Sequence, residues 1–242
     1  MLLIDADTPA YAAAAVCEEL DAANAIWEAN KSIERLLVAT NSIQFKLYLT
    51  GDTNFRYEVF PEYKAHRLNT PRPRFLPQVR EAVLREWNGI LSDGCEADDL
   101  LGIEQTINYS CNIESVICTI DKDLDQIAGW HYHPGIKRKG EWIREPRRYV
   151  VSPLEALRFF YYQMLVGDNA DGIKGVVGIG PAKATKMLTD ILQEEDLFNI
   201  VRDAYSNDAE MEMNARCLWI FHKENDDIVS YWKEKDFYVS DY

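Results

Sequence analysis

The sequence has few of the residues that form disulfides or bind soft metals. It contains only four histidines and five cysteines, an odd number without any CxxC spacing. A disulfide framework and a Cys/His zinc site are therefore disfavoured, and we expect free thiols in a reducing compartment. No run approaches the roughly 20 apolar residues of a membrane-spanning helix, and the acid at Asp5 does not fit the start of a signal peptide. We expect a cytoplasmic protein without a membrane partner.

Positive charge is also scarce overall. The chain has 26 Lys and Arg against 40 Asp and Glu, a net charge of -14, which argues at first against a nucleic-acid partner. The distribution changes this interpretation, because residues 56–80 and 137–148 each carry six Lys or Arg against two Glu. Residues 183–242 carry seven against fourteen acids. Each basic patch taken alone fits a binding face or ordinary solvated surface.

Hydrophobic patterning predicts the fold class. The 242 residues, 47% hydrophobic, suffice for one domain or one domain with a small appendage. Strand-like apolar runs occupy residues 2–4, 45–50, 115–120, 130–133 and 148–151, and helix-period patterns occupy 9–40, 74–88, 96–109 and 153–166. This alternation predicts an α/β fold with a mainly parallel central sheet and flanking helices.

Acidic residues recur in short clusters that mostly follow the strand-like runs. They are Asp5, Asp7, Asp52, Glu96, Asp98, Asp99, Asp121, Asp123, Asp168 and Asp171. Because parallel sheets bind ligands outside the carboxyl ends of their strands, we expect Asp5, Asp52 and Asp121 to meet at one rim. Gathered carboxylates repel one another and need compensating cations. The pattern predicts a site for hard divalent ions such as Mg²⁺ flanking a phosphodiester.

A structural interpretation of two clusters stays open. Glu96 and Asp99 are three residues apart at the start of a helical pattern, with Asp98 beside them, and acids in a first turn also cap helices. Asp121 and Asp123 fit a turn that caps the next helix equally well. What favours the metal site is the coincidence of both clusters with the other rim acids.

Residues 167–188 form a glycine-rich segment. Its glycines punctuate a predicted helix-turn-helix, Pro181 suits a first helical position, and two lysines follow. The residues concerned are Gly172, Gly175, Gly178, Gly180, Lys183 and Lys186. Backbone N–H groups in such a turn can hold a phosphate without reading sequence, which predicts contact with a nucleic-acid backbone.

We place a soft domain boundary near residue 165. Residues 1–165 would form the metal-binding α/β domain, and 166–242 the hairpin region and C-terminal helices. The tail is acidic and carries the aromatic residues Tyr231, Trp232, Phe237, Tyr238 and Tyr242. We expect these side chains to pack the tail onto the body, with a partner-binding tail as the alternative.

Five motifs, taken together, resemble the flap endonuclease or 5′-nuclease family. They are LIDAD at 3–7, GDTNFRYEVFPEYKAHR at 51–67, CEADDLLG at 95–102, TIDKDLDQI at 119–127 and GDNADGIKGVVGIGPAKA at 167–184. The resemblance spans most of the chain and is strongest to compact bacteriophage 5′-3′ exonucleases. It implies a PIN-like 5′-nuclease fold, a helical arch at about 56–90 and a C-terminal helix-hairpin-helix, and host cytoplasm as the location for a phage-encoded protein.

The resemblance also implies a set of metal ligands and cofactors. The matching positions are Asp5, Asp52, Glu96, Asp98, Asp99, Asp121, Asp123, Asp168 and Asp171. The resemblance implies that Asp98, Asp99 and Asp121 are the positions nearest the scissile phosphate, whereas Asp7 is a weaker match and Asp125 is surface charge. The implied cofactors are two or more Mg²⁺ ions, with Mn²⁺ as a substitute, and a monovalent cation at the hairpin.

Further residues match the family's substrate-binding positions. Lys64 and Arg56 are candidate electrostatic stabilisers of the phosphate. Tyr63 would stack on a base or pack half-buried. The predicted DNA contacts are Tyr63, Arg67, Arg72 and Arg74 in the arch, where Arg80 would also line the path of the backbone, and Gly175, Gly178, Gly180, Lys183 and Lys186 in the hairpin.

The activity implied by the resemblance is metal-dependent hydrolysis at a 5′ end or 5′ flap of DNA, and also of RNA–DNA hybrid. It would leave 5′-phosphate and 3′-hydroxyl ends. A monomer acting beside separate replication proteins is implied. Two alternatives stay open: a non-catalytic protein that binds branched DNA on the same fold, and a PIN-like ribonuclease.

Overall fold

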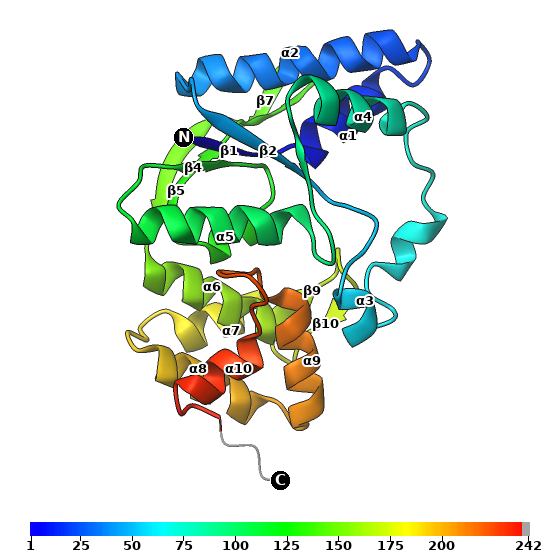
Figure 1. The fold of residues 1–242 in the computed structure, drawn as a ribbon. Coiled ribbons are helices and arrows are strands. Elements are labelled where there is room, and N and C mark those ends of the chain that lie inside the picture. Colours follow the sequence, from blue (N-terminus) through cyan, green and yellow to red (C-terminus); the bar gives the residue numbers. More distant parts are fainter. Residues whose placement is uncertain (239–242) are drawn as a thin grey trace.

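A six-stranded sheet forms the centre of the computed structural model, which describes residues 1–238 (Figure 1). In spatial order the strands are β3 (Ile90–Leu91), β2 (Phe45–Leu49), β1 (Leu2–Asp5), β4 (Val116–Cys118), β5 (Gly129–His133) and β8 (Arg147–Val151). All neighbouring strands are parallel except β5 and β8. The predicted α/β class with a mainly parallel sheet is confirmed.

Helices cover both faces of this sheet. One face packs against α2 (Ala22–Thr40) and α4 (Leu76–Glu86), which in turn pack against α1 (Asp7–Val16). The other face packs against α5 (Ala97–Ser110) and the 3₁₀ helix η2 (Asp123–Gln126). Alternating residues of β1 serve the two cores, since Leu2 and Ile4 face α2 and α4 whereas Leu3 faces α5. The sheet is therefore buried on both sides, as parallel sheets are.

One predicted helical stretch, residues 9–40, is two helices. A turn at residues 17–21 separates α1 from α2, and the Asp21 side chain caps α2 by accepting the Asn24 N–H. The apolar period continues through the turn, so periodicity alone does not show the break.

A second layer consists of C-terminal helices around a separate aromatic core. These are α6 (Pro153–Val166), α7 (Pro181–Leu188), α8 (Glu194–Ala204), α9 (Asp208–Leu218) and α10 (Ile228–Glu234). Trp219 and Trp232 are fully buried among them. The expected packing of the tail is confirmed for Tyr231, Trp232, Phe237 and Tyr238, while Tyr242 lies outside the described residues. The division into two domains near residue 165 stays a prediction, although α6 packs with the later helices.

The glycine-rich segment forms a hairpin between α6 and α7, which fits the expected helix-hairpin-helix better than a plain helix-turn-helix. After α6, the short strands β9 (Gly167–Asp168) and β10 (Ile173–Lys174) pair antiparallel, and a turn then leads into α7, which begins at Pro181 as predicted. Gly167 has a φ of +74°, and a Cβ added to it would lie 2.3 Å from the Gly175 nitrogen. Close backbone packing therefore explains these two glycines.

The predicted arch at 56–90 is a series of short helices rather than one continuous helix. It contains α3 (Arg56–Val59), the 3₁₀ helix η1 (Ala65–Asn69) and α4, joined by an open connection along one edge of the molecule (Figure 1). Pro71 and Pro73 lie in that connection, and proline lacks the N–H that a continuous helix would need.

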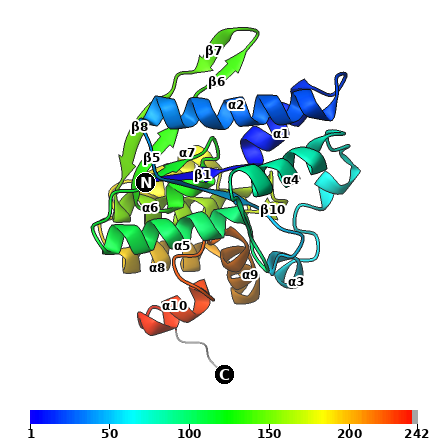
Figure 2. The same ribbon diagram turned by 45° about the horizontal axis from the view of Figure 1, so that its top comes forward.

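The structure contains a hairpin that the apolar patterns did not indicate. Strands β6 (Ile136–Arg138) and β7 (Glu141–Arg144) pair antiparallel and project beyond α2 from the β5–β8 side of the sheet (Figure 2). Within residues 1–238, no helix combines the length and apolar character needed to cross a membrane.

Candidate functional site

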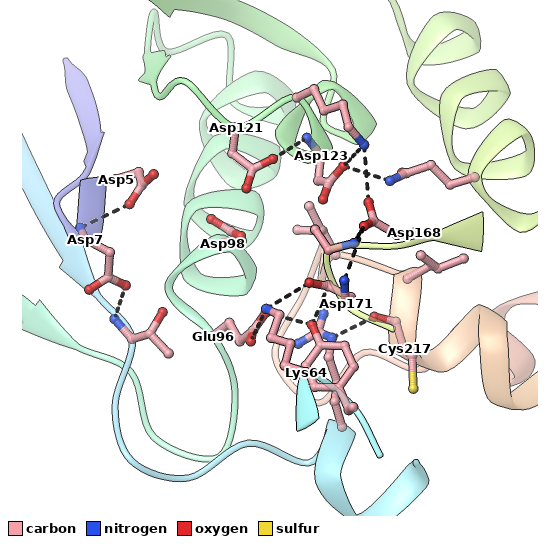
Figure 3. Close-up of a pocket in the computed structure, with 18 of the residues that line it drawn as sticks. Asp5, Asp7, Lys64, Glu96, Asp98, Asp121, Asp123, Asp168, Asp171 and Cys217 are labelled. Atoms are coloured by element: carbon pink, nitrogen blue, oxygen red, sulfur yellow. Dashed lines mark hydrogen bonds and ion pairs between the residues drawn. The ribbon is translucent and has the colours of Figure 1, made fainter. Parts of the chain in front are cut away.

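A cavity of about 260 Å³ opens beside the carboxyl ends of β1 and β4. Seven of the nine predicted metal-ligand residues border it: Asp5, Glu96, Asp98, Asp121, Asp123, Asp168 and Asp171. Asp7 borders it as well. The labelled carboxylates surround the open space from several sides in Figure 3. Segments far apart in sequence thus deliver acids to one place, as the strand-end argument predicted for Asp5 and Asp121. The same prediction is wrong for Asp52, which does not border this cavity.

Asp5 is held rigidly at the end of β1. Its Oδ2 accepts hydrogen bonds from the hydroxyls of Thr8 at 2.9 Å and Thr119 at 3.0 Å, and its Oδ1 accepts the Asp7 N–H. Burial, followed by the charges of Asp7 and Asp121, raises the pKa of Asp5 to about 6. The two threonines were not predicted, although each lies within three residues of a predicted acid.

Two other acids share this electrostatic environment. Burial and the charges of Asp5 and Asp121 raise the pKa of Asp98 well above its usual range. Burial and Asp121 raise the pKa of Asp123 to about 6. These carboxylates destabilise one another when ionised, which is the condition that a bound cation relieves.

The acids border the cavity rather than converge on one point. Across residues 1–238, no three His, Cys, Asp or Glu side chains are arranged closely enough to hold a metal ion directly. Their chemistry nevertheless suits a hard ion, because carboxylate oxygens are the ligands of Mg²⁺, and Mg²⁺ usually keeps several of its waters. The donor set fits hydrated divalent ions held partly through water.

Two lysines lie among the carboxylates. Lys64 Nζ is 2.6 Å from Glu96 Oε1 and 3.5 Å from Asp171 Oδ1. Burial alone would lower the pKa of Lys64, but these two carboxylates raise it, so the ammonium stays charged. Lys64 borders the cavity, and its expected role as a stabiliser of the phosphate stays a prediction.

Lys122 was not predicted as a site residue. Its Nζ lies 3.0 Å from Asp123 Oδ1 and 3.2 Å from Asp168 Oδ2, so it links η2 to β9. Gln163 of α6 also donates to Asp123 Oδ1 at 2.8 Å. The sequence could have indicated Lys122 as a site residue, because it lies between Asp121 and Asp123, and a cation between two clustered acids offsets their repulsion.

Arg56 and Asp99 form a buried structural pair, which bears on the predicted roles of both. The Arg56 guanidinium binds both oxygens of Asp99, at 2.6 and 2.9 Å, and donates to the backbone carbonyls of Cys217 and Trp219. Asp99 is 0% exposed and also accepts the Glu96 N–H. Asp99 does not border the cavity, whereas Arg56 does border it, with its guanidinium bound to Asp99 and to two backbone carbonyls. A direct contact of Arg56 with a phosphate stays a prediction.

Tyr63 does not stack on a base, because its side chain is buried at 1% exposure in the C-terminal core. The packing alternative is the correct one. Its hydroxyl donates to Asp171 Oδ2 at 2.8 Å and lies 3.2 Å from Glu96 Oε2. Arg67, half exposed, binds the carbonyl of Ala170 and Oδ1 of Asp171. Both side chains therefore position Asp171.

One predicted metal ligand, Asp52, and the remaining predicted arch residues lie outside the carboxylate cavity. Asp52 is exposed and borders a neighbouring cavity together with Arg72. Arg80 pairs with Asp7 and with the Thr50 carbonyl. Arg74 is exposed, and its guanidinium lies 5.0 Å from the Phe75 ring centre. Asp52 is thus separated from the main group of acids.

The predicted phosphate-binding turn is partly available for contact. Gly178, with φ +80°, and Gly180 have open space where a Cβ would lie, and both lysines of α7 are exposed. Gly175 is different, because an added Cβ would lie 2.3 Å from the Val166 carbonyl carbon. Chain packing accounts for Gly175, whereas Gly178, Gly180, Lys183 and Lys186 present a free surface.

Comparison with known proteins agrees with this site. Residues 1–140 match the family described as the 5′-3′ exonuclease, N-terminal resolvase-like domain. The chain is 31% identical over 179 residues to a 5′-3′ exonuclease of Mycoplasma pneumoniae, covering 67% of this chain and 61% of that protein. It is 31% identical over 158 residues to flap endonuclease Xni of Pectobacterium atrosepticum, covering 61% and 58%. The matches thus span about three fifths of these relatives.

The fold comparison covers more of the chain. A structure of the T5 5′-exonuclease with bound zinc ions superposes with a TM-score of 0.68 at 15% identity, over 90% of this chain and 88% of that one. Its similarity confirms the 5′-nuclease fold expected from the motifs. Since the matching family profile includes β1, β2, β4 and the acids at their ends, the chain belongs to the 5′-3′ exonuclease family with the N-terminal resolvase-like domain.

Proposed function

We propose that this chain is a divalent-metal-dependent, structure-specific 5′-nuclease that hydrolyses phosphodiesters at a 5′ end or 5′ flap of DNA. The observation that carries the proposal is the ring of seven predicted acids around one cavity, with burial and mutual repulsion raising the pKa of Asp5, Asp98 and Asp123. Its relatives' names, 5′-3′ exonuclease and flap endonuclease, support the same reaction class.

Mg²⁺ is the ion we propose, with Mn²⁺ as a substitute. The residues that would hold the ions are the seven acids around the cavity, Asp52 and Asp99 being placed elsewhere. Bound divalent ions would supply an activated water and stabilise the charge on the leaving oxygen. The products would be a 5′-phosphate and a 3′-hydroxyl.

The protein's own cations complete the site. Lys64 and Lys122 stay charged beside the acids, where each can meet the negative charge of a phosphate. The exposed turn at Gly178 and Gly180, which follows the acids Asp168 and Asp171 in the sequence, presents a surface for a DNA backbone. A phosphate contact of this kind selects the shape of the substrate rather than its sequence.

The test is cleavage of an end-labelled 5′-flap duplex and a matching 3′-flap duplex, in Mg²⁺ or EDTA. Release confined to the 5′ flap, dependent on Mg²⁺ and lost in Asp121→Asn, would support the proposal. Asp203→Asn is the matched control, since this exposed carboxylate lies on α8. Tight binding without cleavage of any substrate would instead identify a non-catalytic DNA-binding protein. An RNA–DNA duplex and a single-stranded RNA in parallel test the hybrid substrate and the ribonuclease alternative.

A further inference from the structure

The β6–β7 hairpin, residues 136–144, is almost entirely exposed and contributes no residue to the carboxylate cavity. All seven strand residues are exposed, including Trp142 at 41% and Ile143 at 67%. A two-stranded hairpin is at best marginally stable in water. Because this one adds no residue to the core, its presence points to a role at the surface.

The hairpin is strongly basic in an acidic protein. It carries Lys137, Lys139, Arg138 and Arg144 against one acid, Glu141, whereas the chain as a whole has a net charge of -14. In residues 1–238, no carboxylate lies within 4.0 Å of any of these four cations. By contrast, the two lysines at the carboxylate cavity are paired, Lys64 with Glu96 and Lys122 with Asp123. These four charges are therefore available to an anionic partner.

The turn at the tip places a lysine where the backbone favours other residues. Lys139 and Gly140 have φ values of +51° and +84°, the two left-handed positions of a two-residue hairpin turn. Asn-Gly is the preferred pair in such a turn. A lysine at this position presents its charge at the outermost point of the hairpin.

The hairpin starts from the rim of the sheet that carries the acids. Strand β5 runs parallel to β4 and β1, so His133 at its carboxyl end lies at the same edge as Asp5. Two strand spacings separate β1 from β5, about 10 Å. The base of the hairpin therefore lies at the same edge of the sheet as the carboxylate cavity, and the hairpin projects from this edge beyond α2.

The shape of the hairpin fits double-helical DNA. The major groove of B-DNA admits a two-stranded β-ribbon, and cations on both strands can then reach the phosphates on either side. Lys137 lies 4.2 Å from the ring centre of Trp142 on the paired strand, so charge and aromatic surface occupy one face. We propose that the hairpin grips duplex DNA next to the site of cleavage. This inference rests on the proposed function.

The experiment measures the salt dependence of binding to a 5′-flap duplex. The triple variant Lys137→Gln/Lys139→Asn/Arg144→Gln removes three charges, and asparagine suits the left-handed position at the tip. Fluorescence anisotropy is recorded in Mg²⁺ at several salt concentrations, in an Asp121→Asn background that keeps the DNA intact. If each cation contacts a phosphate, the slope of log K against log salt falls by about 2.7.

A matched control removes three charges elsewhere. Lys223→Gln/Lys233→Gln/Lys235→Gln changes exposed residues in and beside α10, and its salt slope should equal that of the parent. An unchanged slope in the hairpin variant overturns the inference. A slope that changes for a single strand but not for the duplex overturns it as well. Binding is measured without cleavage, so failure of the nuclease assay alone would overturn only the proposed function.

Discussion

The Nζ of Lys64 lies 2.6 Å from Oε1 of Glu96, which joins the segment after α3 to the first turn of α5 at the edge of the carboxylate cavity. Lys64 itself has a left-handed backbone conformation, with φ +53°, and its N–H donates to the Asp171 carbonyl. Main chain and side chain thus both direct this lysine toward the acids.

Replacement of this lysine should impair cleavage more than folding. Lys64→Met removes a positioned positive charge from the cavity, and loss of one such stabilising group typically lowers kcat by about 10²–10³-fold. Lys64→Arg should retain part of the activity. Single-turnover cleavage of the 5′-flap duplex measures the effect, with Lys223→Met as the exposed control. Wild-type rates in Lys64→Met would show that the lysine has only a structural role.

The buried pair of Arg56 and Asp99 should govern stability. Arg56→Met leaves the Asp99 carboxylate buried without its cation, and breaking a buried pair costs about 3–5 kcal/mol in the free energy of unfolding. Urea denaturation measures this loss. A variant of normal stability whose cleavage is nevertheless lost would instead support a direct role of Arg56 with the phosphate.

The repulsion around Asp98 should appear as pH-dependent stability. The pKa of Asp98 is raised in the folded protein above its model-peptide value of 3.8. The ionised carboxylate therefore destabilises the fold at neutral pH, and protonation in the folded state relieves this as pH falls. Within residues 1–238, the Asp98 side chain makes no hydrogen bond or ion pair, so Asp98→Asn should be more stable than the parent in EDTA. Its advantage should shrink as the pH falls through the raised pKa of Asp98 toward 3.8, the pKa of this carboxyl in the unfolded chain.

The urea midpoints of the parent and of Asp98→Asn are compared at each pH, with Asp203→Asn as the control. Groups that titrate in both proteins contribute equally, so the comparison isolates the effect of Asp98. Addition of Mg²⁺ should then stabilise the parent more than the Asp98→Asn variant, because the ion offsets the repulsion. An advantage that is independent of pH, together with equal stabilisation by Mg²⁺, would contradict a role for Asp98 in the acidic cluster.

A substitution in the glycine turn before α7 should weaken DNA binding without changing the stability of the fold. Gly180 has an ordinary negative φ of -92° and open space where a Cβ would lie, so Gly180→Ala should fold like the parent. The added methyl would stand on the surface that a phosphate must approach, so DNA affinity should fall several-fold. Anisotropy with a plain duplex measures affinity, and urea denaturation checks the fold. Unchanged affinity would place the DNA elsewhere.

Local patterns in the sequence were enough to predict several elements. The predicted strand at 2–4 and the helix at 153–166 agree closely with β1 and α6. Strand ends also predicted that Asp5 and Asp121 would meet, because parallel strands place their carboxyl ends at one edge. These features depend on residues close in sequence or on the general geometry of parallel sheets.

Other features depended on tertiary contacts that no local pattern contains. Asp99 stands beside Asp98 in sequence, yet successive helical residues point in different directions, and only Arg56 from a distant segment shows which acid is buried. In the same way, Lys122 became part of the site because β9 brings Asp168 to it. The sequence by itself determined the fold class, the family and most of the acids. The tertiary structure decided which charges pair with one another, because pairing depends on side-chain direction and on burial between segments far apart in the chain.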